Sequence, residues 1–354
     1  MRTEDEPRPR RRSRKRLAAY AGGGLGAFVV SSAAAAYGVL IGESKLARRR
    51  IPQAVDAPPV SHDTVWAAPG VNRDLAPIRL AMLGDSTAAG YGVQRDRDTP
   101  AAQLAIGISE AARRPVHVTN VAVVGAQSSE LPDQLVALGR ARPQLAVIMV
   151  GANDVTARVK PSTAVPYLED TVERLRARGA QVVVGTCPDL GTIRPIAQPL
   201  RTYARHLSRT MAREQTVAVV RAGGRTVSLG DLLGPQFATR LDLFSDDRFH
   251  PSAAGYAEAT AAVLPSALDA LGLQTRARSA STFTTRFSKT LERAAAQAAT
   301  RPGSEVAPTE HAPVTAALRG RGTWARLRRR RARDPLAVPT EKAVPIEHPD
   351  TPRG

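Results

Sequence analysis

Residues 78–90 read Ile-Arg-Leu-Ala-Met-Leu-Gly-Asp-Ser-Thr-Ala-Ala-Gly, an apolar run that ends in a turn with glycine on both sides of a serine. The run over 78–83 is typical of a strand buried on both faces of a parallel sheet. Because an open α/β sheet presents its reacting groups at the carboxyl ends of its strands, Ser86 is a candidate nucleophile. Gly-Asp-Ser is also common turn chemistry, so the turn alone leaves both interpretations open.

Short apolar runs alternate with helical patterns along the central part of the chain. This alternation predicts crossover units and therefore a parallel sheet. We predict a three-layer α/β/α sandwich with a five-stranded parallel, flavodoxin-like sheet. The expected strands are 78–83, 116–124, 145–150, 181–186 and 216–221. The expected helices are 99–113, 128–140, 162–178, 198–214 and 252–271.

The formal net charge of +18 belongs mainly to the two ends of the chain. Residues 77–272 contain 21 Lys/Arg and 18 Asp/Glu, so the charge of the central domain says little about its substrate. Cys187 is the only cysteine, which excludes an intramolecular disulfide and a zinc site built from paired cysteines. Its place at the end of an apolar run is more typical of a small buried hydrophobe than of a nucleophile.

The N-terminus has the pattern of a membrane anchor. Residues 1–16 hold eight Lys/Arg, and residues 17–42 then give 26 positions without a charge, more than the roughly 20 that span a bilayer. We predict a single-pass signal anchor in the cell membrane, with cleavage and secretion as the first alternative and a buried soluble helix as the second. The excess of basic residues before the anchor places the N-terminus in the cytoplasm and the following domain outside it.

The chain therefore divides into five expected parts. They are a basic cytoplasmic N-terminus over 1–16, the transmembrane anchor over 17–42, a linker over 43–76, a folded domain over 77–274 and a basic, largely disordered tail over 275–354. In the tail, high charge and low hydrophobicity favour disorder, although 281–300 has a pattern compatible with a helix.

Three further groups lie at the ends of expected strands or before the last helix. A parallel sheet would bring them to the same edge as Ser86. A serine hydroxyl needs a base to become a nucleophile, and His250 is the candidate base. Asp247 can reach the other ring nitrogen of His250 and fix its tautomer. The backbone amides of Ser86 and Gly125 and the side chain of Asn153 are candidate donors to an oxyanion.

Each of these residues also has a structural interpretation. Asn153 and Asp247 could cap helices, because Asn and Asp favour that position. His250 could be a surface histidine. The joint occurrence of all the groups in order favours the catalytic interpretation over these alternatives.

The motifs resemble the four blocks of the SGNH, or GDSL-type, hydrolase family, in the order of that family. They are Gly-Asp-Ser at 84–86, the lone Gly125, Gly-Ala-Asn-Asp at 151–154 and Asp-Arg-Phe-His at 247–250. The resemblance covers about residues 77–272, and the whole chain looks like a membrane-anchored member of actinobacterial type.

The resemblance implies a serine esterase or lipase-like enzyme that works through an acyl-enzyme, without metal or organic cofactor. It implies Ser86 as nucleophile, His250 as base, Asp247 as its partner, and the oxyanion donors Gly125 and Asn153 beside the amide of Ser86. The family includes acetylesterases, phospholipases, thioesterases and O-acyltransferases. The substrate is therefore expected to be an ester-containing small molecule, lipid or glycan, and its identity is open.

A function of another class is also compatible with the sequence. A membrane-anchored binding protein could hold anionic wall polymers or anionic lipids through the Arg-rich part of the tail, where 319–333 carries eight arginines. Nucleic acid is not an expected partner for a domain outside the cytoplasm. This alternative and an active domain can coexist in one chain.

The predicted topology can be tested by fusing a reporter that is active only outside the cytoplasm to the C-terminus of the full chain. We expect the reporter to be active, because the basic residues before 17–42 outnumber those close behind it. A matched fusion to a reporter that works only in the cytoplasm should be silent. Activity of the cytoplasmic reporter alone would contradict the predicted orientation.

Overall fold

The structure, a computed structural model, describes seven segments of the chain. They are residues 63–193, 197–230, 240–247, 250–273, 288–301, 303–308 and 324–329. The predicted basic N-terminus over 1–16, the predicted anchor over 17–42 and residues 43–62 of the predicted linker lie outside the described residues. Residues 63–76, which the prediction also assigned to the linker, are described, and the strand Asp63–Trp66 within them is part of the sheet. Among the helices that are described, none is long and apolar enough to cross a membrane.

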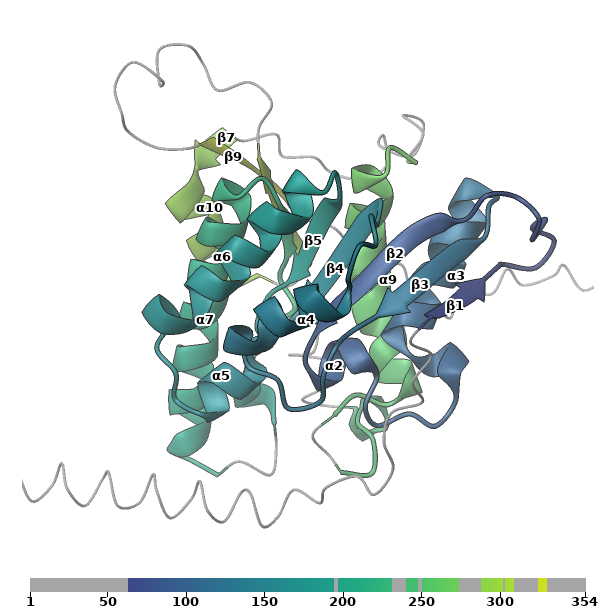
Figure 1. Cartoon of the computed structure of the whole chain (residues 1–354). Coiled ribbons are helices and arrows are strands. Elements are labelled where there is room, and N and C mark those ends of the chain that lie inside the picture. The colour runs from purple at the N-terminus through teal and green to yellow at the C-terminus, as the bar shows by residue number, and fades with distance from the viewer. Residues whose placement is uncertain are drawn as a thin grey trace, which may run out of the picture.

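The strands of the described segments form one sheet with the order β1-β3-β2-β4-β5-β6-β8-β9-β7 (Figure 1). The five central strands, β3-β2-β4-β5-β6, are parallel and have the flavodoxin-like order, which confirms the predicted fold class. β1 on one side and β8, β9 and β7 on the other extend this sheet with antiparallel pairs. The strands are β1 (Asp63–Trp66), β2 (Ile78–Gly84), β3 (Val116–Asn120), β4 (Leu145–Met149), β5 (Gln181–Gly185), β6 (Arg225–Val227), β7 (Ser288–Thr290), β8 (Ser304–Pro308) and β9 (Trp324–Arg329).

Helices cover both faces of the sheet, which gives the three predicted layers. α3 and α9 pack on one face, and α4, α6 and α7 pack on the other (Figure 1). The five predicted helices are all present, with different ends. The helices are α2 (Ser86–Ala89), α3 (Pro100–Ala112), α4 (Leu131–Ala137), α5 (Ala152–Thr156), α6 (Pro161–Ala177), α7 (Leu200–Arg221), α9 (Ala253–Ala270) and α10 (Leu291–Ala298).

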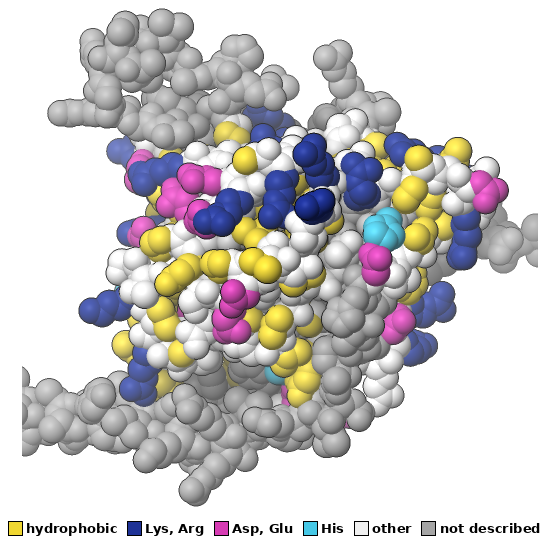
Figure 2. All heavy atoms as spheres, viewed as in Figure 1, with side chains coloured by type: hydrophobic (Ala, Val, Ile, Leu, Met, Phe, Trp, Pro, Cys, Tyr) yellow, Lys and Arg dark blue, Asp and Glu magenta, His cyan; other side chains and the backbone are white. Residues whose placement is uncertain are grey.

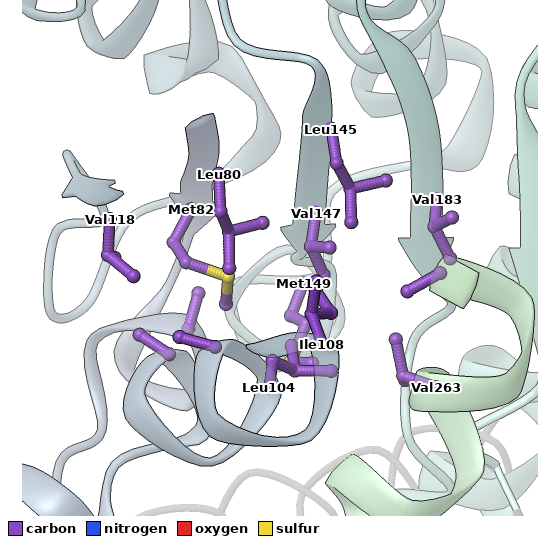
Figure 3. Packing of buried hydrophobic residues seen from close by; sticks show 14 of the residues in the cluster. Leu80, Met82, Leu104, Ile108, Val118, Leu145, Val147, Met149, Val183 and Val263 are labelled. Atoms are coloured by element: carbon purple, nitrogen blue, oxygen red, sulfur yellow. The ribbon is translucent and has the colours of Figure 1, made fainter. Parts of the chain in front are cut away.

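Alternate side chains of each central strand pack into two separate cores. In β2, Leu80 and Met82 face α3 and α9, where they meet Leu104 (Figure 3). Ala81 and Leu83 face the opposite layer of α4, α6 and α7. Because successive residues of a strand point to opposite faces, the part of a strand that is covered on both sides must be apolar, as it is in β2 after the exposed Arg79. This is why the run over 78–83 identifies the centre of the sheet.

The predicted strand over 216–221 is wrong, because these residues continue α7 to its end. A short apolar run cannot be assigned to a helix or a strand from its pattern alone. Here Val219 packs against the sheet and Val220 packs against α10, so the run is buried on two sides of a helix. The fifth parallel strand is β6, which begins after Gly223, a residue with a φ of +80°.

The folded domain extends beyond the predicted boundary at 274. β8 pairs with β6 and β9 pairs with β8, while α10 packs against α7. Among the described residues, three ion pairs join this extension to the rest of the domain: Arg225 with Glu305 at 3.3 Å, Arg328 with Asp269 of α9 at 2.7 Å, and Arg221 of α7 with Glu292 of α10 at 3.5 Å. The prediction of a largely disordered tail is therefore wrong for the described parts of it, 288–301, 303–308 and 324–329.

Basic side chains gather at the end of the sheet where the parallel strands have their amino ends. Figure 2 shows Lys and Arg over the upper part of the molecule, whereas Figure 1 places α2 near its lower end. Arg79 donates from Nε to the carbonyl oxygen of Arg142 at 2.7 Å, and Arg178 donates from Nη1 to that of Gly139 at 3.1 Å. These arginines fix the loops that lead into β4 and β5. They lie at the amino ends of the strands, whereas Ser86 lies at the carboxyl ends.

Gly84 lies where the ends of β2 and β4 approach each other closely. A Cβ atom at this position would be 1.9 Å from the carbonyl oxygen of Met149, and the φ of Gly84 is +129°. The buried side chain of Gln134 bonds both backbone groups of Gly84, since Oε1 accepts from its N–H and Nε2 donates to its carbonyl, each at 2.8 Å. The position therefore requires glycine for steric as well as conformational reasons.

Gly84→Ala should lower the free energy of unfolding of the full chain by more than about 3 kcal/mol, from backbone strain and overpacking together. Gly139→Ala is the matched control. Gly139 also has a positive φ, +59°, but no atom lies within 4 Å of its Cβ position. Gly139→Ala should lower the free energy of unfolding by only about 1 kcal/mol, because it adds backbone strain without a steric clash. Equal losses in thermal or urea unfolding would contradict the steric explanation.

Candidate active site

Ser86 begins the short helix α2 at the carboxyl end of β2. Asp85 is the N-cap of this helix, and its Oδ1 accepts a hydrogen bond from the backbone N–H of Thr87 at 2.9 Å. Gly90 ends the helix in the left-handed region, with a φ of +85°, and its N–H donates to the carbonyl of Ser86. Ser86 is 8% exposed. The glycines at both ends of the turn thus let a nearly buried serine sit at the carboxyl edge of the sheet.

His250 and Asp247 reach Ser86 from a distant part of the sequence. Nε2 of His250 lies 3.1 Å from Oγ of Ser86, and Nδ1 of His250 lies 2.6 Å from Oδ2 of Asp247. The side chains of His250 and Asp247 are only 16% and 3% exposed. The structure therefore brings together the three residues that the sequence analysis proposed as nucleophile, base and partner.

The loop that carries Asp247 is fixed by its own hydrogen bonds. Oδ1 of Asp247 accepts from the backbone N–H of His250 at 2.8 Å and from the hydroxyl of Ser245 at 2.7 Å. The backbone N–H of Ser245 donates to the carbonyl of His250 at 2.8 Å. Because an ionised carboxylate only accepts, the hydrogen of the imidazole must be on Nδ1. This tautomer leaves Nε2 as the acceptor for the hydroxyl of Ser86.

Two tyrosines that the sequence analysis did not single out support this arrangement. The ring of Tyr91 meets the imidazole of His250 edge-on, with centroids 4.6 Å apart. The buried hydroxyl of Tyr256 in α9 donates to the carbonyl of Tyr91 at 2.7 Å. Burial raises the pKa of Tyr256 well above its ordinary value, so this hydroxyl stays a donor. The one sequence signal for the pair is that Tyr91 and Tyr256 follow Ser86 and His250 closely along the chain.

Asp85 is a buried carboxyl group beside the candidate nucleophile. Its exposure is 2%, and this burial raises the pKa of Asp85 from 3.8 to about 6. Hydrogen bonds from Thr87 and the nearby charge of His250 lower the pKa and so oppose the effect of burial only in part. Asp85 caps α2 through the backbone N–H of Thr87, so its geometry fits a role in ordering the turn.

Asn153 lies in the pocket wall with Ser86 and His250. Its side-chain Nδ2 donates to the carbonyl of Ala126 at 3.0 Å. The neighbouring Asp154 is buried and accepts from the N–H and the hydroxyl of Ser128, the latter at 2.8 Å. Burial raises the pKa of Asp154 above its ordinary value. These bonds tie the turn after β4 to the loop after β3.

Gly125 belongs to that loop after β3 and is exposed. β3 ends at Asn120, so the predicted strand end over 121–124 is loop, and Asn120 accepts the N–H of Ala122 through its side chain at 3.1 Å. Gly125 has a φ of +85°, and no atom lies within 4 Å of its Cβ position. Among the described residues that line the pocket, Asn153 is present and Gly125 is not. The catalytic roles of Gly125 and Asn153 stay predictions.

A pocket opens beside Ser86 and His250, and most of its remaining wall is apolar. Most of the apolar side chains come from the loop after β5 and from the segment around His250, and one comes from α5; they are Ala152, Pro188, Leu190, Ile193, Phe244 and Pro251. Such a wall suits a hydrocarbon group next to the reacting serine. Within the described part of the chain, no group of three or more His, Cys, Asp or Glu side chains is placed to hold a metal ion.

Gln215 of α7 is a second buried glutamine that the sequence analysis missed. Its Oε1 accepts from the backbone N–H of Cys187 at 2.8 Å, and its Nε2 donates to the carbonyl of Val150 at 3.0 Å. It thereby joins the ends of β4 and β5 next to the pocket. Burial raises the pKa of the Cys187 thiol well above its ordinary value, which agrees with the expectation that Cys187 is not a nucleophile.

The chain is similar to a known protein family, to a curated protein and to several solved structures. The model of the GDSL-like lipase/acylhydrolase family matches residues 82–258. A GDSL-like esterase of Mycobacterium tuberculosis is 42% identical over 242 residues, 66% of this chain and 77% of that protein. Among solved structures, an extracellular lipase of Streptomyces rimosus is 18% identical with a TM-score of 0.44, over 54% of this chain and 100% of that one. An acetyl-xylooligosaccharide esterase of Geobacillus is 16% identical with a TM-score of 0.45, over 58% and 97%.

The raised pKa of Asp85 predicts how stability depends on pH. Between pH 3.8 and about 6 the folded state keeps a proton that the unfolded state has released, so stability falls as the pH rises through this window. Asp85→Asn keeps the cap and removes this titration. Between pH 4 and pH 7, the free energy of unfolding of the variant should rise relative to that of wild type by up to about 3 kcal/mol. This figure follows from about 1.36 kcal/mol per unit of difference in the pKa.

Urea unfolding at several pH values measures this difference. The matched control is Asp133→Asn, which removes an exposed carboxylate from α4 and should leave the pH dependence of the wild type in place. A constant difference in stability between Asp85→Asn and wild type across the range would contradict the prediction.

Proposed function

Since the chain belongs to the GDSL-like lipase/acylhydrolase family and is an SGNH-type esterase, we propose that it cleaves carboxylic esters through an acyl-enzyme on Ser86. The observation that carries this proposal is the hydrogen-bonded chain from Ser86 through His250 to Asp247, with distances of 3.1 and 2.6 Å. A serine, a base within hydrogen-bond reach and a third group that orients the base form the arrangement that activates a hydroxyl.

The proposed reaction has two halves. In the first, Nε2 of His250 takes the hydroxyl proton of Ser86 while Oγ forms a bond to the carbonyl carbon of the ester. The tetrahedral intermediate then collapses, the bond to the alcohol oxygen breaks, and His250 gives its proton to that oxygen. In the second half, water or another hydroxyl attacks the acyl-enzyme with the same base, and Ser86 regains its proton. Asp247 stabilises the imidazolium that forms in each half.

In the tetrahedral intermediate, negative charge develops on the former carbonyl oxygen of the ester. Hydrogen-bond donors that point at this oxygen stabilise the charge. We propose the backbone N–H of Ser86, the backbone N–H of Gly125 and Nδ2 of Asn153 for this role. A side-chain amide has two donor hydrogens, and that of Asn153 uses one on Ala126, so the second remains for the pocket. The positive φ of Gly125 and its exposed position are compatible with close approach of a substrate.

The place of action is proposed from the sequence. The charge-free segment 17–42 would hold the domain at the outer face of the cell membrane, where an ester-containing small molecule, lipid or glycan could reach the pocket. Whether the acyl group goes to water or to another hydroxyl depends on the acceptor that enters the pocket. Both outcomes use the same acyl-enzyme.

The full chain should hydrolyse p-nitrophenyl acetate and should be labelled by a fluorophosphonate. Ser86→Ala should lose the label and nearly all turnover, because the hydroxyl that it removes is the one 3.1 Å from Nε2 of His250. Ser162→Ala, which removes an exposed serine at the start of α6, is the matched control and should behave as wild type. Equal labelling and turnover in wild type and Ser86→Ala would overturn the proposed mechanism.

A further inference from the structure

The loop of His250 packs next to the turn that follows β2, because Ser245 and Pro251 of that loop lie against the backbone of Gly92. The loop after β5 forms another part of the pocket wall. Ser86 follows β2, Asn153 follows β4, and residues 188–193 follow β5, which lies beyond β4 as seen from β2. The order of the loops along the pocket edge is therefore serine, Asn153 and then the β5 loop. Leu190 and Ile193 are the larger aliphatic side chains that this loop gives to the pocket.

The chemistry at Ser86 decides which half of an ester would meet this loop. The alcohol oxygen must lie next to Nε2 of His250, because it receives its proton there. The carbonyl oxygen must lie next to the donors, of which Asn153 is one. The remaining substituent of the carbonyl carbon is the acyl chain, and it must extend away from His250. It then points past Asn153 toward Leu190 and Ile193.

The described residues behind this part of the wall are packed into a buried cluster. Leu190 and Ile193 line the pocket although they are only 3% and 5% exposed, so most of each side chain faces the interior. They belong to a buried cluster that includes Ala204 and Met211 of α7. A close-packed interior gives little room for a longer chain without moving side chains.

An ion-pair cluster also holds the loop on α7. The carboxylate of Asp189, 1% exposed, lies 3.4 Å from Nε of Arg205 and 3.2 Å from Nη2 of Arg209. Its Oδ1 accepts the N–H of Gly191 at 2.8 Å, and Arg205 donates to the carbonyl of Gly191 at 3.0 Å. A buried carboxylate with two arginine partners and a backbone partner resists displacement, because breaking the set leaves a buried charge.

From this geometry we propose that Leu190 and Ile193 close an acyl-binding slot, and that the substrates are esters of short, straight carboxylic acids such as acetyl to butyryl esters. Asp189, Arg205 and Arg209 are positioning residues that keep the slot closed. The proposal rests on the proposed acyl-enzyme function and adds the class of acyl group and the residues that select it.

The test compares p-nitrophenyl acetate, butyrate and octanoate as substrates of the full chain. Wild type should have the highest kcat/KM for acetate or butyrate. Ile193→Ala should raise the ratio of kcat/KM for octanoate over acetate by about 10-fold or more, since each methylene in an apolar pocket is worth at least that factor. Val165→Ala is the matched control, because Val165 lies in the same buried cluster on α6 and does not line the pocket.

The outcomes separate this proposal from the proposed function. If wild type neither cleaves acetate nor takes a fluorophosphonate on Ser86, the acyl-enzyme function fails. If wild type does both but prefers octanoate, or if Ile193→Ala keeps the wild-type ratio, only the slot is overturned. An equal rise in Val165→Ala would also overturn it, because general loosening of the cluster would then be the cause. Ile193→Val keeps the test usable if Ile193→Ala does not fold, with a smaller rise expected.

Discussion

The candidate site depends on the close approach of β2 and β4 at their carboxyl ends. The carbonyl of Met149 occupies the space that a side chain at position 84 would need, and it accepts the N–H of Asp85 at 2.9 Å. The chain must therefore leave β2 through a glycine, and the turn that follows places Ser86 beside the end of β4. Asn153, a few residues past that end, lines the same pocket. The packing of the backbone, more than any single side chain, therefore places Ser86 and Asn153 at the same pocket.

The base reaches this neighbourhood through a second close approach. A Cβ atom on Gly92, whose φ is +98°, would lie 3.0 Å from the hydroxyl of Ser245, which itself donates to Asp247. Gly92 therefore lets the segment after α2 pack directly on the loop that presents His250. The 3.1 Å contact between the imidazole and Ser86 is thus fixed by backbone contacts on both partners, and this preorganisation is what proton transfer requires.

The sequence was sufficient to predict the parallel sheet and the position of most candidate site residues. Both follow from local apolar patterns and from the rule that parallel strands end on the same side of a sheet. Apolar strands that alternate with helices imply a parallel sheet, and a parallel sheet collects Ser86, Asn153 and the last loop at one edge. It was not sufficient for contacts between distant elements. Gln134 has no local signal, because its partner is the backbone of β2, 50 residues away. The apolar run at 216–221 was misassigned because burial on two sides of a helix produces the same pattern as a strand.

The antiparallel extension has a consequence for association of the protein with itself. β6 has only three residues, and β8 covers the edge that would otherwise follow it, with Glu305 buried against Arg225. Without β8 and α10, β6 would end the sheet in open N–H and carbonyl groups beside the apolar patch that α7 presents to α10. Open edges of this kind recruit strands from other molecules. β8 and α10 thus cover a strand edge and an apolar face through which copies of the domain could otherwise pair.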